Sequence, residues 1–226
     1  MPTDVERAKR RAGESAAELV EDGTVVGLGT GSTAAHAIRA LGERADSGLD
    51  IRGVPTSHGA RALAIDAGVP LVGLDEALPD VAIDGADQLA GGDCVKGGGA
   101  AHAHEKVVAA AADRLVLVVD DRKLADRLDH PVPVEVLPDA VPTVRAAVRE
   151  AGGEPTLRAA ERKDGPVVTD NGNPVLDCAF GAIDSPGELA GRLSALPGVV
   201  EHGLFVGLAD EAHVGSADGV ERRRYD

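Results

Sequence analysis

Three short glycine-rich segments contain the residue types that could bind and transform a small anionic molecule. The first is Gly27-Leu28-Gly29-Thr30-Gly31-Ser32-Thr33, which lies between an expected strand and an expected helix. Glycines let the backbone approach a ligand, and the free N–H groups at the start of a helix attract an anion. A tight turn with no ligand is the alternative. The density of small and hydroxyl residues, with Thr30, Gly31, Ser32 and Thr33 in succession, favours an anion site.

The pattern also restricts which anion this first segment could bind. No lysine precedes Ser32-Thr33, so it is not a Walker A loop, and the dinucleotide fingerprint fails because these residues stand where its last glycine belongs. The next expected strand, Ile51–Val54, is followed by Pro55-Thr56-Ser57 rather than by an acid that would bind a ribose diol. A sugar phosphate or a mononucleotide fits better than NAD.

The second segment is Asp84-Gly85-Ala86-Asp87, which directly follows the expected strand Val81–Ile83. In open α/β sheets, ligands bind at the carboxyl ends of the strands, so two carboxylates around a glycine turn could face one pocket and handle hydroxyl protons. An Asx-type turn with helix capping explains the same residues, and the pattern alone leaves both interpretations open.

The third segment is Lys96-Gly97-Gly98-Gly99, ahead of an expected helix that runs through Ala112. Three successive glycines cost backbone entropy, which makes a loop without a purpose costly. Lys96 adds a positive donor. Glu105 is expected about two turns into the helix, where its carboxylate could reach the ligand or could simply be solvated.

The histidines do not predict a metal site. His102 and His104 are two residues apart on a helix and face different directions, unlike the i, i+4 pair of a zinc site. Lys123, which follows Asp120-Asp121-Arg122 at another strand end, is well placed at the same sheet edge.

Strands and helices must alternate to position these segments. The pattern predicts an α/β fold: a Rossmann-like, mostly parallel sheet domain with a second, smaller ferredoxin-like α+β domain of split βαβ type. We expect the first domain to span residues 1–129 and 207–226, and the second to span 130–206. In the second domain, Asn171-Gly172 is a strong hairpin signal between expected strands at 167–169 and 175–178. Further strands are expected at 69–72 and, as one piece, at 199–206.

Composition limits the class of protein. Apolar residues make up 43% of the chain, but there is no Trp, one Tyr and two Phe, so branched aliphatics must fill the core. The formal charge of −15, from 38 acidic and 23 basic residues, opposes binding to nucleic acid or to an anionic membrane. Because the acids are dispersed, we expect a halophilic protein of a salt-rich cytosol. Cys94 and Cys178 are expected to be buried thiols, and we expect neither a signal peptide nor a membrane span.

Taken together, the motifs VGLGTGSTA, IDGAD, KGGGAA followed by EK, PVPVEVLP, VVTDNGN, LPGVVEHGLF and ADGV resemble those of ribose-5-phosphate isomerase of the A type. The resemblance covers essentially the whole chain in order. It implies interconversion of ribose 5-phosphate and ribulose 5-phosphate in the non-oxidative pentose phosphate pathway. It also implies a homodimer or homotetramer that needs no metal or organic cofactor. The cysteines and the lack of an apolar span separately lead us to expect a cytoplasmic protein.

The resemblance also implies roles for individual residues. Glu105 falls on the family's general base, Lys123 on a substrate-binding lysine, and the three glycine-rich segments on its substrate loops. Asp84, Asp87 and Lys96 are then expected to be catalytic with Glu105, the aspartates in ring opening and hydroxyl-proton transfer and Lys96 as the partner of the oxyanion. The Lys9-Arg10 pair matches, loosely, a basic pair near the phosphate. The chain departs from the family at Gln88, where an acid is usual, and in carrying His102 and His104.

Two other functions remain as alternatives. One is a related sugar-phosphate isomerase or deaminase, which release of ammonia from an amino-sugar phosphate would reveal. The other is a non-catalytic module that binds a sugar effector, as in sugar-responsive regulators. The acidic surface disfavours this alternative, because such a regulator would have to bind DNA.

Overall fold

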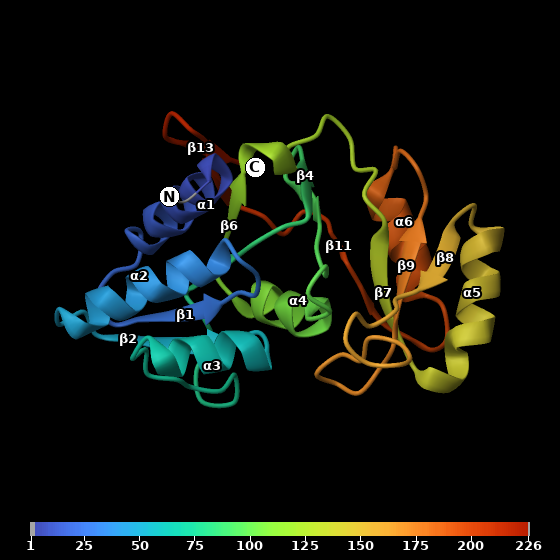
Figure 1. Cartoon of the computed structure of the whole chain (residues 1–226), viewed down its shortest axis with the longest axis horizontal. Coiled ribbons are helices and arrows are strands. Elements are labelled where there is room, and N and C mark those ends of the chain that lie inside the picture. Colours follow the sequence, from blue (N-terminus) through green and yellow to red (C-terminus); the bar gives the residue numbers. More distant parts are fainter. Residues whose placement is uncertain (1–2, 226) are drawn as a thin grey trace. The chain divides into compact units, whose positions relative to one another are not determined.

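The computed structural model of the chain describes residues 3–225, which fall into two compact units (Figure 1). Unit 1 contains the chain as far as Ala86, together with His104–Leu124 and the segment from Leu208 onward. Unit 2 contains Asp87–Ala103 and Ala125–Gly207. These boundaries differ from the expected domains mainly at residues 87–103, which the sequence pattern assigns to the first domain, and also at 125–129 and 207. The physical reason is strand pairing, because a hairpin in this segment pairs with a strand near residue 205.

Unit 1 is built on a six-stranded sheet in the order β13-β12-β6-β3-β1-β2. All neighbours in this sheet are parallel except β13, which runs antiparallel to β12 at one edge. This arrangement confirms the predicted Rossmann-like sheet and the return of the last segment to it. The strands are β1 (Thr24–Leu28), β2 (Ile51–Pro55), β3 (Val81–Asp84), β6 (Leu115–Asp120), β12 (Glu211–Gly215) and β13 (Val220–Arg224).

Helices cover both faces of this sheet, which explains the aliphatic composition. All six residues of β6 are buried, as expected for a parallel strand with helices on both sides. Buried alanines and aliphatics of three helices share one core cluster with the sheet. On the opposite face, a Cβ added at Gly27 would lie 2.7 Å from Val108 Cγ1, so the fourth helix packs closely there. The helices are α1 (Asp4–Ala17), α2 (Ala34–Asp46), α3 (His58–Asp66) and α4 (His102–Ala111).

Unit 2 combines two antiparallel sheets. The larger sheet has the order β10-β7-β9-β8, and along the chain its elements run β7-α5-β8-β9-α6-β10, the ferredoxin-like arrangement that the sequence predicts. The smaller sheet has the order β11-β5-β4. The elements are β4 (Gln88–Ala90), β5 (Asp93–Val95), β7 (Val132–Val136), α5 (Val141–Glu150), β8 (Glu154–Leu157), β9 (Val175–Ala179), α6 (Pro186–Ser194), β10 (Val199–His202) and β11 (Leu204–Phe205). Two short 3-10 helices, η1 (Asp121–Lys123) in unit 1 and η2 (Pro138–Ala140) in unit 2, complete the fold.

Three expected strands differ from the structure. Residues 69–72 form only a single bridge, between Leu71 and Gly53, and residues 167–169 form only a bridge between Val168 and Pro174. The expected strand at 199–206 is divided at Gly203 into β10 and β11, which belong to different sheets. Gly203 permits this break because an added Cβ would lie 2.0 Å from the carbonyl oxygen of Lys96.

The two cysteines are buried, as the sequence predicts, and burial raises the pKa of the Cys178 thiol to about 12. We expect neither thiol to react with a thiol reagent in the native protein, and both to react once it is unfolded. Spectrophotometric titration with and without denaturant checks this, and rapid native labelling of Cys178 would contradict it. Because its folded pKa is the higher one, this thiol contributes stability that is lost as pH rises above about 9, where the unfolded thiol ionises.

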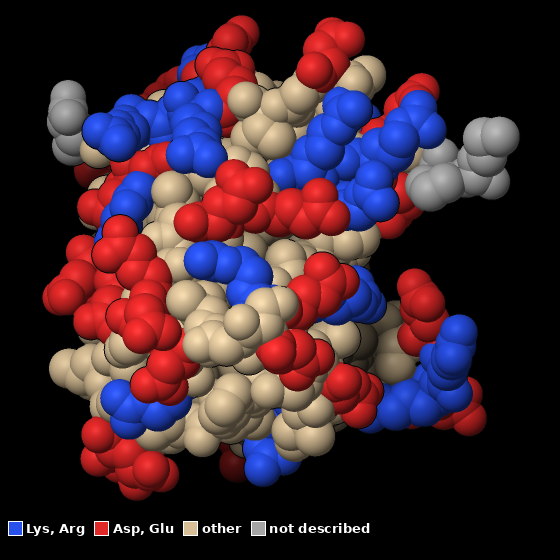
Figure 2. All heavy atoms as spheres, turned by 90° about the vertical axis from the view of Figure 1, so that its left-hand side faces the viewer, with Lys and Arg blue, Asp and Glu red and all other residues tan. Residues whose placement is uncertain are grey.

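Acidic side chains are spread over the face shown in Figure 2, with basic and uncharged residues between them, rather than gathered in one patch. This distribution matches the dispersed acids of the sequence. Among residues 3–225, no helix is both long enough and apolar enough to cross a membrane.

Candidate active site

The first glycine-rich segment lies at the switch point of the unit 1 sheet. The chain leaves β1 toward β2 on one side, and β3 lies on the other side of β1. In open α/β sheets the crevice beside such a reversal is where ligands bind. Thr30 follows the carboxyl end of β1 and Asp84 ends β3, so two expected site residues meet at this position.

Asp84 holds the first loop through its carboxylate. Its Oδ1 accepts hydrogen bonds from the backbone N–H of Thr30, at 3.0 Å, and of Gly85, at 2.7 Å. Gly29 is required here, because an added Cβ would lie 2.2 Å from the same oxygen. The buried Asp84 therefore positions the anion loop as well as presenting a carboxylate at the sheet edge.

The hydroxyl of Thr30 connects this loop to the start of α3. Its Oγ1 donates to Ser57 Oγ at 2.7 Å and lies 2.9 Å from Thr56 Oγ1. Ser57 is the N-cap of α3, where its Oγ accepts from the N–H of Ala60 at 3.0 Å. The N-cap of α2, Thr33, makes no side-chain capping bond. The N–H groups of Ala35 and His36 donate to backbone carbonyls, whereas those of residues 32–34 have no acceptor among residues 3–225. Such open N–H groups ahead of a helix suit an anion, which supports the predicted role of this loop. A hollow of about 180 Å³ borders the loop between α2 and α3.

Glu105 lies in the first turn of α4, not two turns into it as the sequence pattern suggests. The difference arises because the chain from Gly97 to Ala101 is a loop and the helix begins only at His102. The side chain is 4% exposed. A helix N-terminus stabilises a carboxylate, and burial removes water that would compete for a transferred proton.

A further carboxylate, Asp120, lies at the end of β6 and was not assigned a role from the sequence. Its Oδ1 accepts from Arg122 Nε at 2.7 Å, whereas its buried Oδ2 has no hydrogen-bond partner among the described residues. Burial alone raises the pKa of Asp120, but the hydrogen bond and charge of Arg122 outweigh it and hold the pKa below its ordinary value. The signal that could have found it is its position at the carboxyl end of a buried strand. Lys123 follows in η1 and is partly buried.

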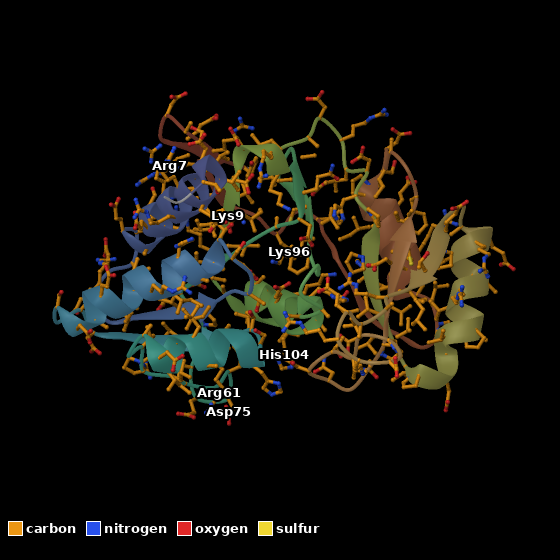
Figure 3. The ribbon with its side chains drawn as sticks, in the orientation of Figure 1. Arg7, Lys9, Arg61, Asp75, Lys96 and His104 are labelled. Atoms are coloured by element: carbon orange, nitrogen blue, oxygen red, sulfur yellow. The ribbon has the colours of Figure 1, made fainter. Side chains whose placement is uncertain are left out.

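Lys96 is the buried cation among the expected site residues of unit 2, and Figure 3 labels it. It follows β5, and its backbone N–H donates to the carbonyl of Gly203 at 2.8 Å. The side chain is 2% exposed, and its Nζ lies 5.4 Å from the centre of the Phe205 ring. A lysine held in this way loses little freedom when it binds an anion, because the protein has already ordered it.

The loop after Lys96 is tied to Asp87. The Asp87 Oδ2 accepts from the N–H of Gly98 at 2.7 Å, so this carboxylate positions the loop in addition to the proton-transfer role expected of it. Gly97 has a φ of +105° and Ala100 a φ of +57°. Glycine adopts this region readily, but an alanine keeps it only where surrounding contacts enforce it, as is common at functional sites.

The remaining departures from the family pattern have structural explanations. His102 is fully buried, with Nε2 3.3 Å from the carbonyl oxygen of Glu201, whereas His104 is exposed, which confirms that the two face different directions. Gln88 accepts from the N–H groups of Asp129 and His130, at 2.7 and 2.9 Å, and so holds the start of the following connection.

Two basic groups considered for the phosphate, Lys9 and Arg10, pair with acids of their own helix. Lys9 Nζ lies 3.1 Å from Glu6, and Arg10 lies 3.7 Å from Glu14. A larger hollow of about 540 Å³ in unit 1, which the sequence did not reveal, is lined by aliphatic side chains together with Arg61, Glu76 and His104 (Figure 3).

Unit 1 thus places an anion loop beside buried carboxylates at the ligand-binding edge of a parallel sheet. Acid–base chemistry on a small phosphorylated molecule is the class of activity that this arrangement supports.

Comparison with known proteins identifies the family. Residues 52–219 match the family described as ribose 5-phosphate isomerase A (phosphoriboisomerase A). A ribose-5-phosphate isomerase A from the halophilic archaeon Natronomonas pharaonis is 69% identical over 218 residues, covering 96% of this chain and 97% of the relative.

Two solved structures have the same fold over nearly the whole chain. Ribose 5-phosphate isomerase A from Methanocaldococcus jannaschii has 44% identity and a TM-score of 0.94, over 97% of this chain and 99% of that one. A D-ribose-5-phosphate isomerase in complex with phospho-erythronic acid has 41% identity and a TM-score of 0.95, over 98% and 100%. The chain belongs to the ribose 5-phosphate isomerase A family, which confirms the resemblance. It is an aldose–ketose isomerase that interconverts ribose 5-phosphate and ribulose 5-phosphate.

Proposed function

We propose that the isomerisation proceeds through an enediolate and that Glu105 moves the proton. The carboxylate takes the proton from C2 of the open-chain aldose and returns it to C1, acting first as base and then as acid. The observation that carries this assignment is the burial of Glu105 in the first turn of α4, close to the backbone N–H groups of the helix N-terminus.

Lys96 and the backbone N–H groups of residues 97–99 stabilise the negative charge that develops on the substrate oxygen. As C2 loses its proton, negative charge develops on the carbonyl oxygen at C1, and a fixed ammonium group with backbone N–H donors stabilises it. Burial of Lys96 supports this role, because the charge acts in a site with little water. Asp84 and Asp87 open the furanose ring and move hydroxyl protons.

The loop after β1 and Lys123 anchor the substrate. We assign the substrate contacts to Thr30, Gly31, Ser32 and Thr33, together with Asp84–Asp87, Lys96–Gly99 and Lys123. The open N–H groups of residues 32–34, ahead of α2, and the bond from Thr30 to the N-cap of α3 support an anion here. Binding energy from a remote phosphate can then orient the reacting carbons.

The ligand of one relative fits this chemistry. Phospho-erythronic acid, which occupies that solved isomerase, has a planar carboxylate with two oxygens where an enediolate has its two oxygens. We expect it to bind this chain as a mimic of the reaction intermediate, and therefore more tightly than the substrate.

A direct assay tests the mechanism without added metal. Purified protein treated with EDTA should form ribulose 5-phosphate from ribose 5-phosphate at its full rate. Dependence on a restored divalent cation would contradict proton transfer by side chains alone. Release of ammonia from an amino-sugar phosphate would point to the deaminase alternative.

The setting of the enzyme is also a proposal. We infer a cytoplasmic homodimer or homotetramer that serves the non-oxidative pentose phosphate pathway and binds no nucleic acid or membrane. The dispersed acidic surface supports the expected lack of binding to nucleic acid or membrane, because it repels polyanions. Light scattering coupled to gel filtration should give two or four chains, and a monomer would contradict it.

We expect salt to stabilise the protein. With a formal charge of −15, self-repulsion destabilises the compact state at low ionic strength, and salt screens that repulsion. Thermal unfolding from low to molar KCl should show Tm rising with concentration. Equal or greater stability at low salt would contradict this.

A further inference from the structure

Arg158 directly follows β8 in unit 2 and contacts backbone carbonyls of the loop Lys96–Gly99. Its Nη1 donates to the carbonyl oxygen of Gly97 at 2.8 Å and to that of Gly98 at 3.2 Å. A guanidinium group suits this task, because its donors form a rigid fork and it stays charged at every physiological pH. Two successive peptide carbonyls of one expected substrate loop are therefore held by one cation.

Asp177 on β9 fixes this guanidinium in turn. The pair is bidentate, with Nε 2.9 Å from Oδ2 and Nη2 2.5 Å from Oδ1. The side chains of Arg158 and Asp177 are 16% and 31% exposed, so the pair is partly shielded from water. The backbone N–H of Arg158 also donates to the carbonyl of Val175 at 2.9 Å, which anchors the residue to the antiparallel sheet.

The contacts determine how the loop's peptide groups are turned. In a trans peptide the carbonyl and the N–H point in opposite directions. The peptide group between Gly97 and Gly98 is thus hydrogen-bonded on both sides. Its carbonyl accepts from Arg158, and its N–H donates to Asp87. In the next peptide, the carbonyl of Gly98 faces Arg158, so the N–H of Gly99 points away from the guanidinium. Gly99 is exposed, and its N–H has no acceptor among residues 3–225.

The loop needs such an external restraint. Gly97 and Ala100 both have positive φ, a conformation that glycine adopts readily but that is strained for Ala100. Three adjacent glycines impose little conformational preference of their own. The N–H of Ala100 donates to the carbonyl of Gly97 at 2.9 Å, but among residues 3–225 only Arg158 holds the carbonyl of Gly98. Without Arg158, the peptide between Gly98 and Gly99 would sample several orientations.

We propose that Arg158, oriented by Asp177, is a positioning residue that turns the N–H of Gly99 toward the oxyanion formed during isomerisation. This inference rests on the proposed role of the Lys96–Gly99 loop. Removing the guanidinium frees the carbonyl of Gly98 and leaves that of Gly97 only its bond from the N–H of Ala100. The N–H donor of Gly99 is then no longer preorganised for the transition state.

The test is Arg158→Ala, with Arg127→Ala as the matched control. Arg127 is also in unit 2 and pairs with an aspartate, Asp184, at 2.6 Å, but this pair is exposed and does not contact the loop. We expect Arg158→Ala to lower kcat by about 10- to 100-fold, with KM for ribose 5-phosphate changed by less than about threefold. Affinity for phospho-erythronic acid should fall by a factor similar to that in kcat. Arg127→Ala should have the same kcat, KM and affinity for phospho-erythronic acid as the unmodified protein.

Chemical rescue distinguishes positioning from a general structural role. Methylguanidinium at a concentration that leaves Tm unchanged should restore part of the kcat of Arg158→Ala, but none of that lost in Lys96→Ala. A kcat within about twofold of the control would overturn the inference, as would a loss confined to KM or a loss that methylguanidinium cannot reduce. If Lys96→Ala is itself fully active, the proposed loop function fails. If Lys96→Ala loses activity but Arg158→Ala keeps it, the positioning role of Arg158 fails and the proposed loop function stands.

Discussion

Replacing Glu105 with glutamine should lower kcat by at least about 10³-fold, because the amide cannot accept the C2 proton. The substitution keeps the size of the side chain and its place in the first turn of α4. Binding of the phosphorylated sugar depends on the loops around Thr30 and Lys96 in this account, so affinity should change little. Stopped assays of ribulose 5-phosphate formation and calorimetric binding of phospho-erythronic acid measure the two quantities separately.

A matched control for Glu105→Gln is Glu188→Gln, which alters a glutamate in the first turn of α6, an exposed position in unit 2. This variant should retain full activity. Near-normal turnover of Glu105→Gln would remove Glu105 from the role of base.

Replacing Lys96 with alanine should lower kcat by about 10²- to 10³-fold, the effect typical of losing one group that stabilises an oxyanion. Lys96 is 2% exposed, so its charge acts with little screening by water. KM should change less than kcat, because the charge on the substrate oxygen develops only on the way to the intermediate.

The control for Lys96→Ala is Lys163→Ala, which removes an exposed lysine from the same unit. This variant should be fully active, and both proteins should keep the Tm of the unmodified chain within a few degrees. A pure KM effect in Lys96→Ala would mean that Lys96 binds substrate and transition state equally.

The sequence predicts most of the catalytic framework because the relevant signals are local. Gly29 and Gly97 belong to turns that directly follow strands, and the strands are short aliphatic runs that must lie in a covered sheet. The carboxyl ends of parallel strands meet at one edge, so Asp84 and Lys123 could be placed near that edge from their positions alone. The role of Glu105 is different, since it rests on the family and not on spacing.

The remaining features depend on contacts between distant parts of the chain. Arg158 is 61 residues from Gly97, and no periodicity connects an arginine after one strand to a carbonyl in another loop. Asp120 looks like an ordinary strand end until its burial is known. The break at Gly203 depends on a distant contact in the same way. Apolar residues lie on both sides of it, and only the close approach of Lys96 requires the glycine.

The central claim is that a protein carboxylate carries the proton between C2 and C1 of the sugar through an enediolate. It is tested most directly by converting unlabelled ribose 5-phosphate in D₂O with the EDTA-treated enzyme and following C1 of the product by NMR. The account predicts deuterium at C1 of ribulose 5-phosphate that increases over many turnovers, and neither product nor label with Glu105→Gln. Isomerisation by Glu105→Gln at the normal rate, with the original hydrogen retained at C1, would contradict it, because the hydrogen would then pass between the carbons without this carboxylate.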